Sequence, residues 1–301
     1  MTSQIKLTFL GTSAQIPTVR RNHSAILLNY NEENILIDCG EGTQRQIRKA
    51  RLNPCKITRI LITHWHLDHV LGLAGLLSTL ASSGYNKTLY IYGPKGIKFK
   101  MKKLLEFFKF FKEYEIKIEE VGKGKFLETK DFYLEAEKMK HGIPTNAYKF
   151  VKKGKLRIDK KKLSKLKLVA GVHLLSLKNG KDIKHDGKKY KVKDITYQEE
   201  DKIVSVVLDT LNNSKINSFV KGSDLFVCEA SYDSSLNEKA KEHLHMTARQ
   251  AGEIAKKSKV KKLILTHISQ RYDNKLKVLE KDVKSVFKDV VIAKDLDVVE
   301  V

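Results

Sequence analysis

The sequence has few cysteines, no long apolar run and a shortage of acidic residues. Its three cysteines are Cys39, Cys55 and Cys228, with no C-x-x-C spacing among them. So sparse and odd a set excludes a disulfide framework and favours reduced thiols in a cytoplasmic compartment. No stretch of eighteen apolar residues occurs, which argues against a membrane span, and the first residues read as a strand rather than as a signal peptide.

The shortage of acidic residues makes the chain strongly basic. Lys and Arg number 58 against 35 Asp and Glu, which gives a formal net charge of +23. This charge indicates a polyanionic partner, although solvated surface lysine would give the same total. Residues 151–193 alone contain 16 Lys and Arg and 3 Asp, with leucines between them. We interpret this segment as a protruding module that offers lysine to phosphates; a disordered basic loop is the alternative.

Strand-like runs alternate with helical patterns along the rest of the chain, as in a layered α/β domain. Helices are predicted at 43–51, 69–83, 95–111, 214–221, 247–257 and 276–288. Several predicted strands end in polar or ionisable residues, in the sequences DCG, TH, DT, EA and TH. Because functional loops of α/β domains follow strand ends, we expect a site there.

The stretch "THWHLDH" contains three histidines and an aspartate between an apolar strand and an apolar helix. His64 and His66 alternate along the extended end, whereas Asp68 and His69 begin the helix and point elsewhere. Imidazole nitrogen and carboxylate oxygen are zinc ligands, and this division favours two adjacent metal ions. A surface histidine cluster, or Asp68 acting as a helix cap, is the competing interpretation.

A two-metal site needs further ligands from other strand ends. His141 follows "LEAEKMK", Asp209 ends "IVSVVLDT" and His267 ends "KKLILT". Each alone would usually be structural, but together with the four-residue motif they indicate one site, in which the two oxygens of Asp209 bridge the ions. Two such ions are suited to activating water against a phosphodiester.

Proton transfer needs further groups. Asp68 is our candidate general base, because it can also take a proton from the attacking water. Glu229, at a strand end, and His245, before a helix, are candidates for a carboxylate-oriented general acid. A salt bridge and a helix cap are the structural alternatives, and His243 is the competing acid.

At this point the sequence resembles the short form of ribonuclease Z, within the metallo-β-lactamase superfamily. The resemblance covers nearly the whole chain. Beyond the histidine motif it rests on "LTFLGTSAQIPTVRRN", "LIDCGEGTQRQIRKA", "LYIYGPKG", "KMKHGIPTNAYKF" and "LILTHISQRYD". It implies a four-layer αββα sandwich over residues 1–301, with an inserted tRNA-binding arm at 151–195.

The resemblance also implies the roles of individual residues. His64, His66 and His141 would hold one ion, Asp68, His69 and His267 the other, and Asp209 would bridge them. Two Zn²⁺ are expected, with Mn²⁺ or Fe possible. Glu229 and the segment His245-Met246-Thr247 match further family motifs. Leu208 stands where the family usually has glycine before the bridging aspartate.

The function implied is an endoribonuclease that removes the 3′ trailer from precursor tRNA and leaves a 3′-hydroxyl. We expect precursor tRNA as substrate, a homodimer, no membrane and no DNA partner. The expected RNA contacts are Arg20, Arg21, Asn22, Lys152, Lys153, Lys160, Lys161 and Lys162. A phosphodiesterase of the same superfamily acting on small molecules, and a non-catalytic RNA-binding protein, are the alternatives.

Overall fold

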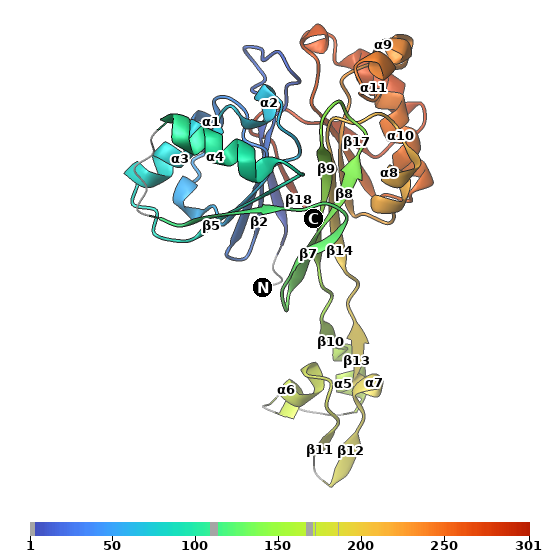
Figure 1. The fold of residues 1–301 in the computed structure, drawn as a ribbon. Coiled ribbons are helices and arrows are strands. Elements are labelled where there is room, and N and C mark those ends of the chain that lie inside the picture. The colour runs from blue at the N-terminus through green and yellow to red at the C-terminus, as the bar shows by residue number, and fades with distance from the viewer. Residues whose placement is uncertain (1–3, 109–113, 167–170, 172, 186) are drawn as a thin grey trace. The chain divides into compact units, whose positions relative to one another are not determined.

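A computed structural model of the chain describes residues 4–108, 114–166, 171, 173–185 and 187–301. The chain divides into two compact units. The first, which we call the sandwich unit, comprises residues 1–127, 134–150 and 203–301, and the second, the basic unit, comprises residues 128–133 and 151–202. Figure 1 shows the elements of both.

The first sheet of the sandwich unit changes from antiparallel to parallel along its width. Its strand order is β18 (Val298–Glu300), β1 (Lys6–Gly11), β2 (Ala25–Tyr30), β3 (Glu33–Ile37), β4 (Arg59–Leu61), β5 (Leu89–Gly93) and β6 (Ile116–Glu120). Strands β3 to β6 run parallel. Helices α1 (Thr43–Lys49), α3 (Leu73–Ser82) and α4 (Ile97–Phe108) cover its outer face. Leu73, Leu76 and Met101 pack there against Ile60 and Ile91 in one apolar cluster.

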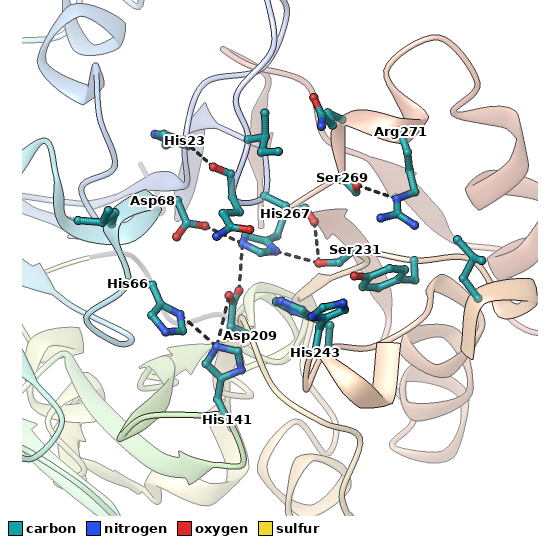
Figure 2. A pocket seen from close by; sticks show the side chains of 18 of the residues that line it. His23, His66, Asp68, His141, Asp209, Ser231, His243, His267, Ser269 and Arg271 are labelled. Carbon is teal, nitrogen blue, oxygen red and sulfur yellow. Dashed lines mark hydrogen bonds and ion pairs between the residues drawn. The ribbon is translucent and has the colours of Figure 1, made fainter. Parts of the chain in front are cut away.

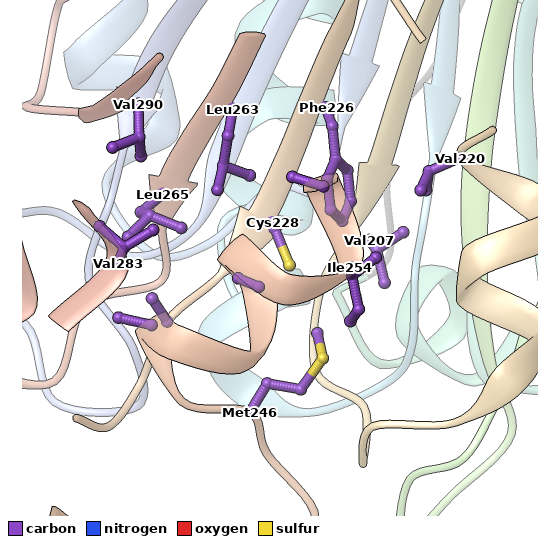
Figure 3. Close-up of a cluster of buried hydrophobic side chains, with 14 of the residues drawn as sticks. Val207, Val220, Phe226, Cys228, Met246, Ile254, Leu263, Leu265, Val283 and Val290 are labelled. Carbon is purple, nitrogen blue, oxygen red and sulfur yellow. The ribbon is translucent and has the colours of Figure 1, made fainter. Parts of the chain in front are cut away.

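The second sheet has a parallel half that leads to the site. Its order is β17 (Val290–Ile292), β16 (Lys262–Thr266), β15 (Leu225–Glu229), β14 (Lys202–Val207), β9 (Thr145–Lys152), β8 (Phe132–Met139) and β7 (Gly124–Glu128). Strands β14 to β17 are parallel. Helices α8 (Ser214–Phe219), α10 (Ala248–Lys257) and α11 (Lys277–Lys284) cover it. Figure 3 shows the cluster between them, in which Ile254 and Val283 meet Phe226 and Leu265.

The two sheets face each other across an apolar layer. Leu28 and Ile35 of the first sheet and Phe150 and Val204 of the second line the same narrow space between them. Helix, sheet, sheet and helix therefore form four layers, and the predicted αββα sandwich is confirmed. Both faces of each sheet are apolar and must be covered. The other sheet covers the inner face, and helices cover the outer face.

The basic unit has a small apolar core of its own. It contains the ribbons β10 (Leu156–Ile158) with β13 (Thr196–Gln198), and β11 (Ile183–His185) with β12 (Lys188–Tyr190), and the helices α5 (Lys160–Lys165), α6 (His173–Lys178) and α7 (Val192–Ile195). Leu174, Leu177, Ile183 and Ile195 are buried together, and Leu163 packs against them. These contacts contradict the alternative of a structureless basic loop for the described part of the segment.

Several elements differ from the sequence prediction. The helix predicted at 69–83 is two helices, α2 (Leu67–Val70) and α3, which are separated at Gly72. A side chain at Gly72 would lie 2.1 Å from the carbonyl oxygen of Gly40, so the close approach of these segments requires glycine. Strands β6, β7 and β17 are short, and each contains at least one exposed residue, so the sequence signal for them is weak. None of the described helices combines the length and apolarity that a membrane span needs.

A hydrogen bond joins the two sheets next to the histidine motif. The hydroxyl of the buried Tyr148 in β9 donates to the carbonyl oxygen of Ile62 at 2.6 Å. We expect Tyr148→Phe to lower the free energy of unfolding by about 1–3 kcal/mol, because it leaves a buried carbonyl without this donor. Urea denaturation measures the change. Tyr197→Phe, at a tyrosine that is 54% exposed, is the matched control, and an equal loss in both would contradict the role of the hydrogen bond.

Candidate functional site

The seven predicted ligands meet at one edge of the sandwich unit. His64 and His66 follow β4, Asp68 and His69 lie in α2, His141 follows β8, Asp209 follows β14 and His267 follows β16. Ligand atoms of His64, His66, His141 and Asp209 form one group, and those of Asp68, His69, Asp209 and His267 form a second, each within 4.8 Å. Both groups open into a cavity of about 1120 Å³ (Figure 2). The ligands after β4 come from the first sheet and those after β8, β14 and β16 from the second, so the ends of strands from both sheets meet at the site.

The first group is built from three imidazoles. His64 Nε2 lies 2.9 Å from His66 Nδ1, which lies 3.2 Å from His141 Nε2. Asp209 Oδ2 is 3.5 Å from His64 Nε2 and 4.0 Å from His141 Nε2. Two ligands at about 2.1 Å from a tetrahedral ion are roughly 3.4 Å apart, so the spacing suits zinc.

The second group shares Asp209 with the first. His69 Nε2 lies 3.3 Å from His267 Nε2, and Asp68 Oδ2 lies 3.3 Å from each of these nitrogens. Asp209 Oδ2 is 3.5 Å from His69 Nε2, and its Oδ1 is 3.1 Å from His267 Nε2. Asp209 thus reaches both groups, which is the arrangement expected of a bridging carboxylate.

Hydrogen bonds on the far side of the rings set where the protons lie. The Leu244 carbonyl, 3.2 Å from His141 Nδ1, can only accept, so Nδ1 carries the proton and Nε2 is a free lone pair. Asp38 Oδ2 has the same effect on His69 Nδ1, at 2.6 Å. Ser231 Oγ donates to Glu229 Oε2 at 2.9 Å and therefore accepts from His267 Nδ1 at 3.0 Å. In the neutral form of each of these rings, Nε2 therefore carries the lone pair that faces the centre.

These lone pairs provide the test of whether the residues fit a metal. Asp209 Oδ1 is buried and has no hydrogen-bond donor among the described residues, although His267 Nε2 is only 3.1 Å away. Two lone pairs that face each other in a buried place repel unless a cation lies between them. Nitrogen and carboxylate donors at these spacings suit a divalent cation of the zinc type.

The pKa shifts of the histidines in the two ligand groups agree with a cation-binding centre. Burial, with the other rings nearby, lowers the pKa of His64, and burial also lowers the pKa of His66 and His141, so these three rings are neutral ligands. Burial opposes the charge of His69, but Asp209 and Asp38 raise its pKa well above the ordinary value. The carboxylates therefore create a potential that favours positive charge at the second group.

Three residues at strand ends have a left-handed backbone. Asp38, Asp209 and His267 have φ of 57°, 35° and 55°. Such conformations cost free energy in residues other than glycine and persist only where neighbours hold them. For Asp209 the holding contact is specific, since the next amide, Thr210 N, donates to the buried Glu229 Oε1 at 2.7 Å.

Leu208 is accommodated without strain of its own. Its side chain is buried, and its φ is not positive, unlike that of Asp209 beside it. The left-handed residue at this strand end is thus the aspartate rather than the residue before it. With Leu208 before it, Asp209 lies within 4.8 Å of the other ligand atoms of both groups.

His245 and Glu229 form the predicted pair at the wall of the cavity. His245 Nδ1 lies 2.9 Å from Glu229 Oε2, and Glu229 is fully buried. Burial lowers the pKa of His245, but Glu229 and Asp209 raise it, to about 9 as the net result. His243, the competing acid, is exposed and has no carboxylate partner among the described residues; its ring lies parallel to Tyr232. The geometry favours His245 as the acid.

Three residues that the sequence analysis did not name orient the ligands. Asp38 accepts from Thr63 N and Thr63 Oγ1 at 2.7 Å and from His69, while Thr63 Oγ1 lies 3.1 Å from His64 Nδ1. Ser231 joins Glu229 to His267. Asp38 stands at a strand end in "DCG", so the signal was present. Ser231 lacked any such signal, because it lies two residues beyond Glu229 in a loop.

Among the expected RNA contacts, the N-terminal ones differ in exposure. Arg21 is 3% exposed and donates to Thr12 Oγ1 and the Ala293 carbonyl, and Asn22 donates to the Glu41 carbonyl. Both side chains are thus engaged within the fold, which does not favour them as RNA contacts. Arg20 is exposed, although its Nη1 donates to Asn274 Oδ1 at 2.9 Å. In the basic unit Lys160, Lys161 and Lys162 are exposed, whereas the side chain of Lys152 is mostly buried.

Known proteins with similar sequences cover the chain almost end to end. Ribonuclease Z of Nanoarchaeum equitans is 36% identical over 97% of this chain and 92% of its own. Ribonuclease Z of Listeria welshimeri is 37% identical over 99% of both chains. The family model described as anti-Pycsar protein Apyc1 matches residues 5–151.

Solved structures agree on the fold. The metallo-β-lactamase fold protein YhfI from Bacillus subtilis has a TM-score of 0.72 at 20% identity, with both chains covered completely. The short form of human tRNase Z has a TM-score of 0.71 at 26% identity, with 98% of each chain covered. The fold is therefore the metallo-β-lactamase fold, and the chain belongs to the ribonuclease Z family.

Proposed function

We propose that this chain is a metal-dependent endoribonuclease that removes the 3′ trailer from precursor tRNA. The observation that carries the proposal is the convergence of seven ligands in two groups, joined by Asp209, beside the His245–Glu229 pair in one cavity. The family relation supports the substrate, since the curated relatives are named Ribonuclease Z and a structural neighbour is a tRNase Z. The products are a tRNA with a 3′-hydroxyl and a trailer with a 5′-phosphate.

The ligand groups define what the residues do at the reacting phosphate. Two divalent ions held there would supply charge neutralisation and an activated water. Asp68 lies on the cavity, and its Oδ2 is 3.3 Å from Nε2 of both His69 and His267. Burial opposes its ionisation, but the adjacent rings of His267 and His69 hold its pKa well below the ordinary value. Asp68 is therefore ionised, and its Oδ1 is the oxygen we assign to accept a proton from the attacking water.

His245 donates the proton that the leaving oxygen needs. As water attacks phosphorus, the bond from phosphorus to the 3′-oxygen of the tRNA breaks, and that oxygen takes the proton of His245 Nε2. Glu229 fixes the ring through Nδ1, so Nε2 is directed away from the carboxylate. Because the pKa of His245 is about 9, the ring is protonated at neutral pH and ready to act as acid.

Lysines and an arginine supply the phosphate contacts outside the cavity. The exposed Lys160, Lys161 and Lys162 follow the N-cap residue Asp159 on α5. Lys153, also in the basic unit, is half-buried, and its Nζ bonds to the Thr129 carbonyl at 2.8 Å and to Glu128 at 2.6 Å. Arg20 is held near Asn274 in the sandwich unit. A lysine-rich surface of this kind binds backbone rather than base edges, so recognition would follow the shape of tRNA.

The proposal includes the finer points of the resemblance. We assign two Zn²⁺ to the site, with Mn²⁺ or Fe as possible substitutes, because imidazole and carboxylate ligands accept all three. On the family relation alone, we also propose that the chain forms a homodimer and that its partner is tRNA. All three cysteines are free, which supports a reducing, cytoplasmic location.

Substitution of the shared ligand tests the metal site. We expect Asp209→Asn to lower bound zinc from about two ions per chain to one or fewer, since the carboxamide cannot bridge the two groups. Cleavage of precursor tRNA should fall with it. Metal analysis after dialysis measures the content, with His185→Ala in the basic unit as a histidine control. Full zinc content in Asp209→Asn would overturn the bridging role.

The pH profile tests the acid. The wild-type rate should fall as pH rises through about 9, because His245 loses its proton there. Glu229→Gln removes the main group that raises this pKa, so the alkaline limb should shift to lower pH. His245→Ala should lose about 10²- to 10⁴-fold in rate and lack this limb. Glu242→Gln, at an exposed glutamate, is the control. An unmoved limb in Glu229→Gln would refute the pairing.

Salt dependence tests the lysines of the basic unit. Each lysine–phosphate contact adds about 0.7 to 0.9 to the slope of log affinity against log salt. Replacing Lys160, Lys161 and Lys162 together by alanine should therefore reduce the slope by roughly 2 to 3. The control replaces the exposed Lys256, Lys257 and Lys259 of the sandwich unit, and filter binding gives both slopes. Equal slopes for the wild type and the first triple variant would exclude α5 from the RNA interface.

A further inference from the structure

The cavity extends beyond the ligand groups along a wall that the proposed reaction does not use. This wall carries Tyr232, Leu236, His243, Arg271 and Lys275. It combines two aromatic rings with two cations, whereas the ligand side of the cavity carries the carboxylates. Aromatic faces beside cations are the combination that binds single-stranded nucleotides, through base stacking and phosphate contact.

Arg271 is a cation held in place with part of its guanidinium free. Its Nε donates to Ser269 Oγ at 3.0 Å, and its Cζ lies 4.7 Å from the centre of the Tyr232 ring (Figure 2). The segment is anchored by Tyr272, whose buried hydroxyl accepts from Asp233 N at 2.9 Å and donates to Asp233 Oδ2. The two Nη groups of Arg271 have no partner within the described parts of the chain. They are available to a phosphate, at little cost in side-chain entropy.

His243 offers an exposed ring on the same wall of the cavity. Its ring lies parallel to Tyr232, with an interplanar angle of 2° and centroids 6.4 Å apart. It is the C-cap residue of α9 (Asn237–Glu242), but the cap uses its backbone amide rather than its ring. Packing on Tyr232 would be a sufficient structural reason for a buried aromatic residue. It does not explain an exposed imidazole at the wall of the cavity, which suits a ligand with a flat face.

The position of the acid shows which nucleotide lies at this wall. His245 protonates the 3′-oxygen of the tRNA, so the nucleotide that carries this oxygen lies on the His245 side of the scissile bond. The Tyr232 ring is 6.3 Å from that of His245. The wall therefore borders the last nucleotide retained in the tRNA rather than the first nucleotide of the trailer.

We propose that Tyr232, His243 and Arg271 form a subsite for the last retained nucleotide of the substrate. Its base stacks on His243, and Arg271, with Lys275 beside it, binds the phosphate on the 5′ side of that nucleotide. The subsite rests on the proposed function, because it lies on the side of the scissile bond that carries the leaving 3′-oxygen. Because every base has an aromatic face, the subsite holds any of the four bases and positions the scissile bond without reading sequence.

The test compares two precursors that differ only at the last retained nucleotide, one natural and one abasic. For wild type, loss of the base should lower kcat/KM by roughly 5- to 150-fold, the range for one stacked base. His243→Ala should show a loss of that size on the natural precursor and no further loss on the abasic one. His243→Phe should retain wild-type behaviour on both, since phenylalanine stacks but cannot transfer a proton. Phe99→Ala, which removes an aromatic ring that is 65% exposed, is the matched control.

The outcomes separate this subsite from the proposed function. If wild type cuts the natural precursor and the abasic one equally well, the subsite is overturned and the function stands. Equal losses on both precursors in His243→Ala also overturn it, because the ring would then act without the base. If wild type cuts neither precursor, the proposed function itself fails.

A second variant keeps the test valid if His243→Ala folds poorly. Arg271→Gln is compared on precursors with a natural phosphate or a neutral methylphosphonate on the 5′ side of the last retained nucleotide. The neutral linkage should weaken wild-type kcat/KM by at least about fivefold and leave Arg271→Gln unchanged, since that variant has already lost the charge pair. Additive losses would overturn the assignment of Arg271.

Discussion

The structure of the site depends on the repulsion among lone pairs around Asp209. Its buried Oδ1 faces His267 Nε2 at 3.1 Å, and no proton lies between them because Ser231 holds the proton of that ring on Nδ1. A cation between these two atoms, a metal ion or a proton, would relieve this unfavourable contact. Residues such as Asp38 and Ser231 contribute by fixing protons on the far side of the rings, which leaves the near nitrogens for a metal ion.

The need to bring Asp209 and His267 together at one centre also explains the strained backbone of these two residues. Asp209 and His267 end parallel strands with φ of 35° and 55°, which turns their side chains into the shared centre rather than along the strands. Glu229 holds one of these turns through the amide of Thr210, and with its other oxygen it binds His245. One buried carboxylate thus fixes both the bridging ligand and the acid. Loss of Glu229 would be expected to disturb two functions that appear separate along the sequence.

The parts of this arrangement that sequence could predict are those with local patterns. The histidine motif lies within six residues, and the strand ends that hold His141, Asp209 and His267 are marked by apolar runs. The orienting contacts are harder to predict, because Asp38 is marked only as a strand end and Ser231 not at all, while the ligands they orient lie 31 and 36 residues away. Arg21 shows the converse case: a basic residue in a basic chain suggests phosphate, yet its guanidinium is buried by bonds to Thr12 and Ala293. The charge of a residue alone does not reveal whether its side chain is exposed or buried.

Electrostatics also relates the centre to the rest of the molecule. Asp38, Asp68, Asp209 and Glu229 are all buried near one another, and such a set repels a phosphodiester. Bound divalent ions would therefore be a condition for the substrate to enter as well as for its cleavage. The lysines of the basic unit act over a longer range and are screened by salt, whereas the buried centre is not. Substrate capture by the lysines should therefore weaken as ionic strength rises, whereas the cleavage step should change little. Contacts to Arg271 and Lys275, on the wall of the cavity, should show an intermediate dependence on salt.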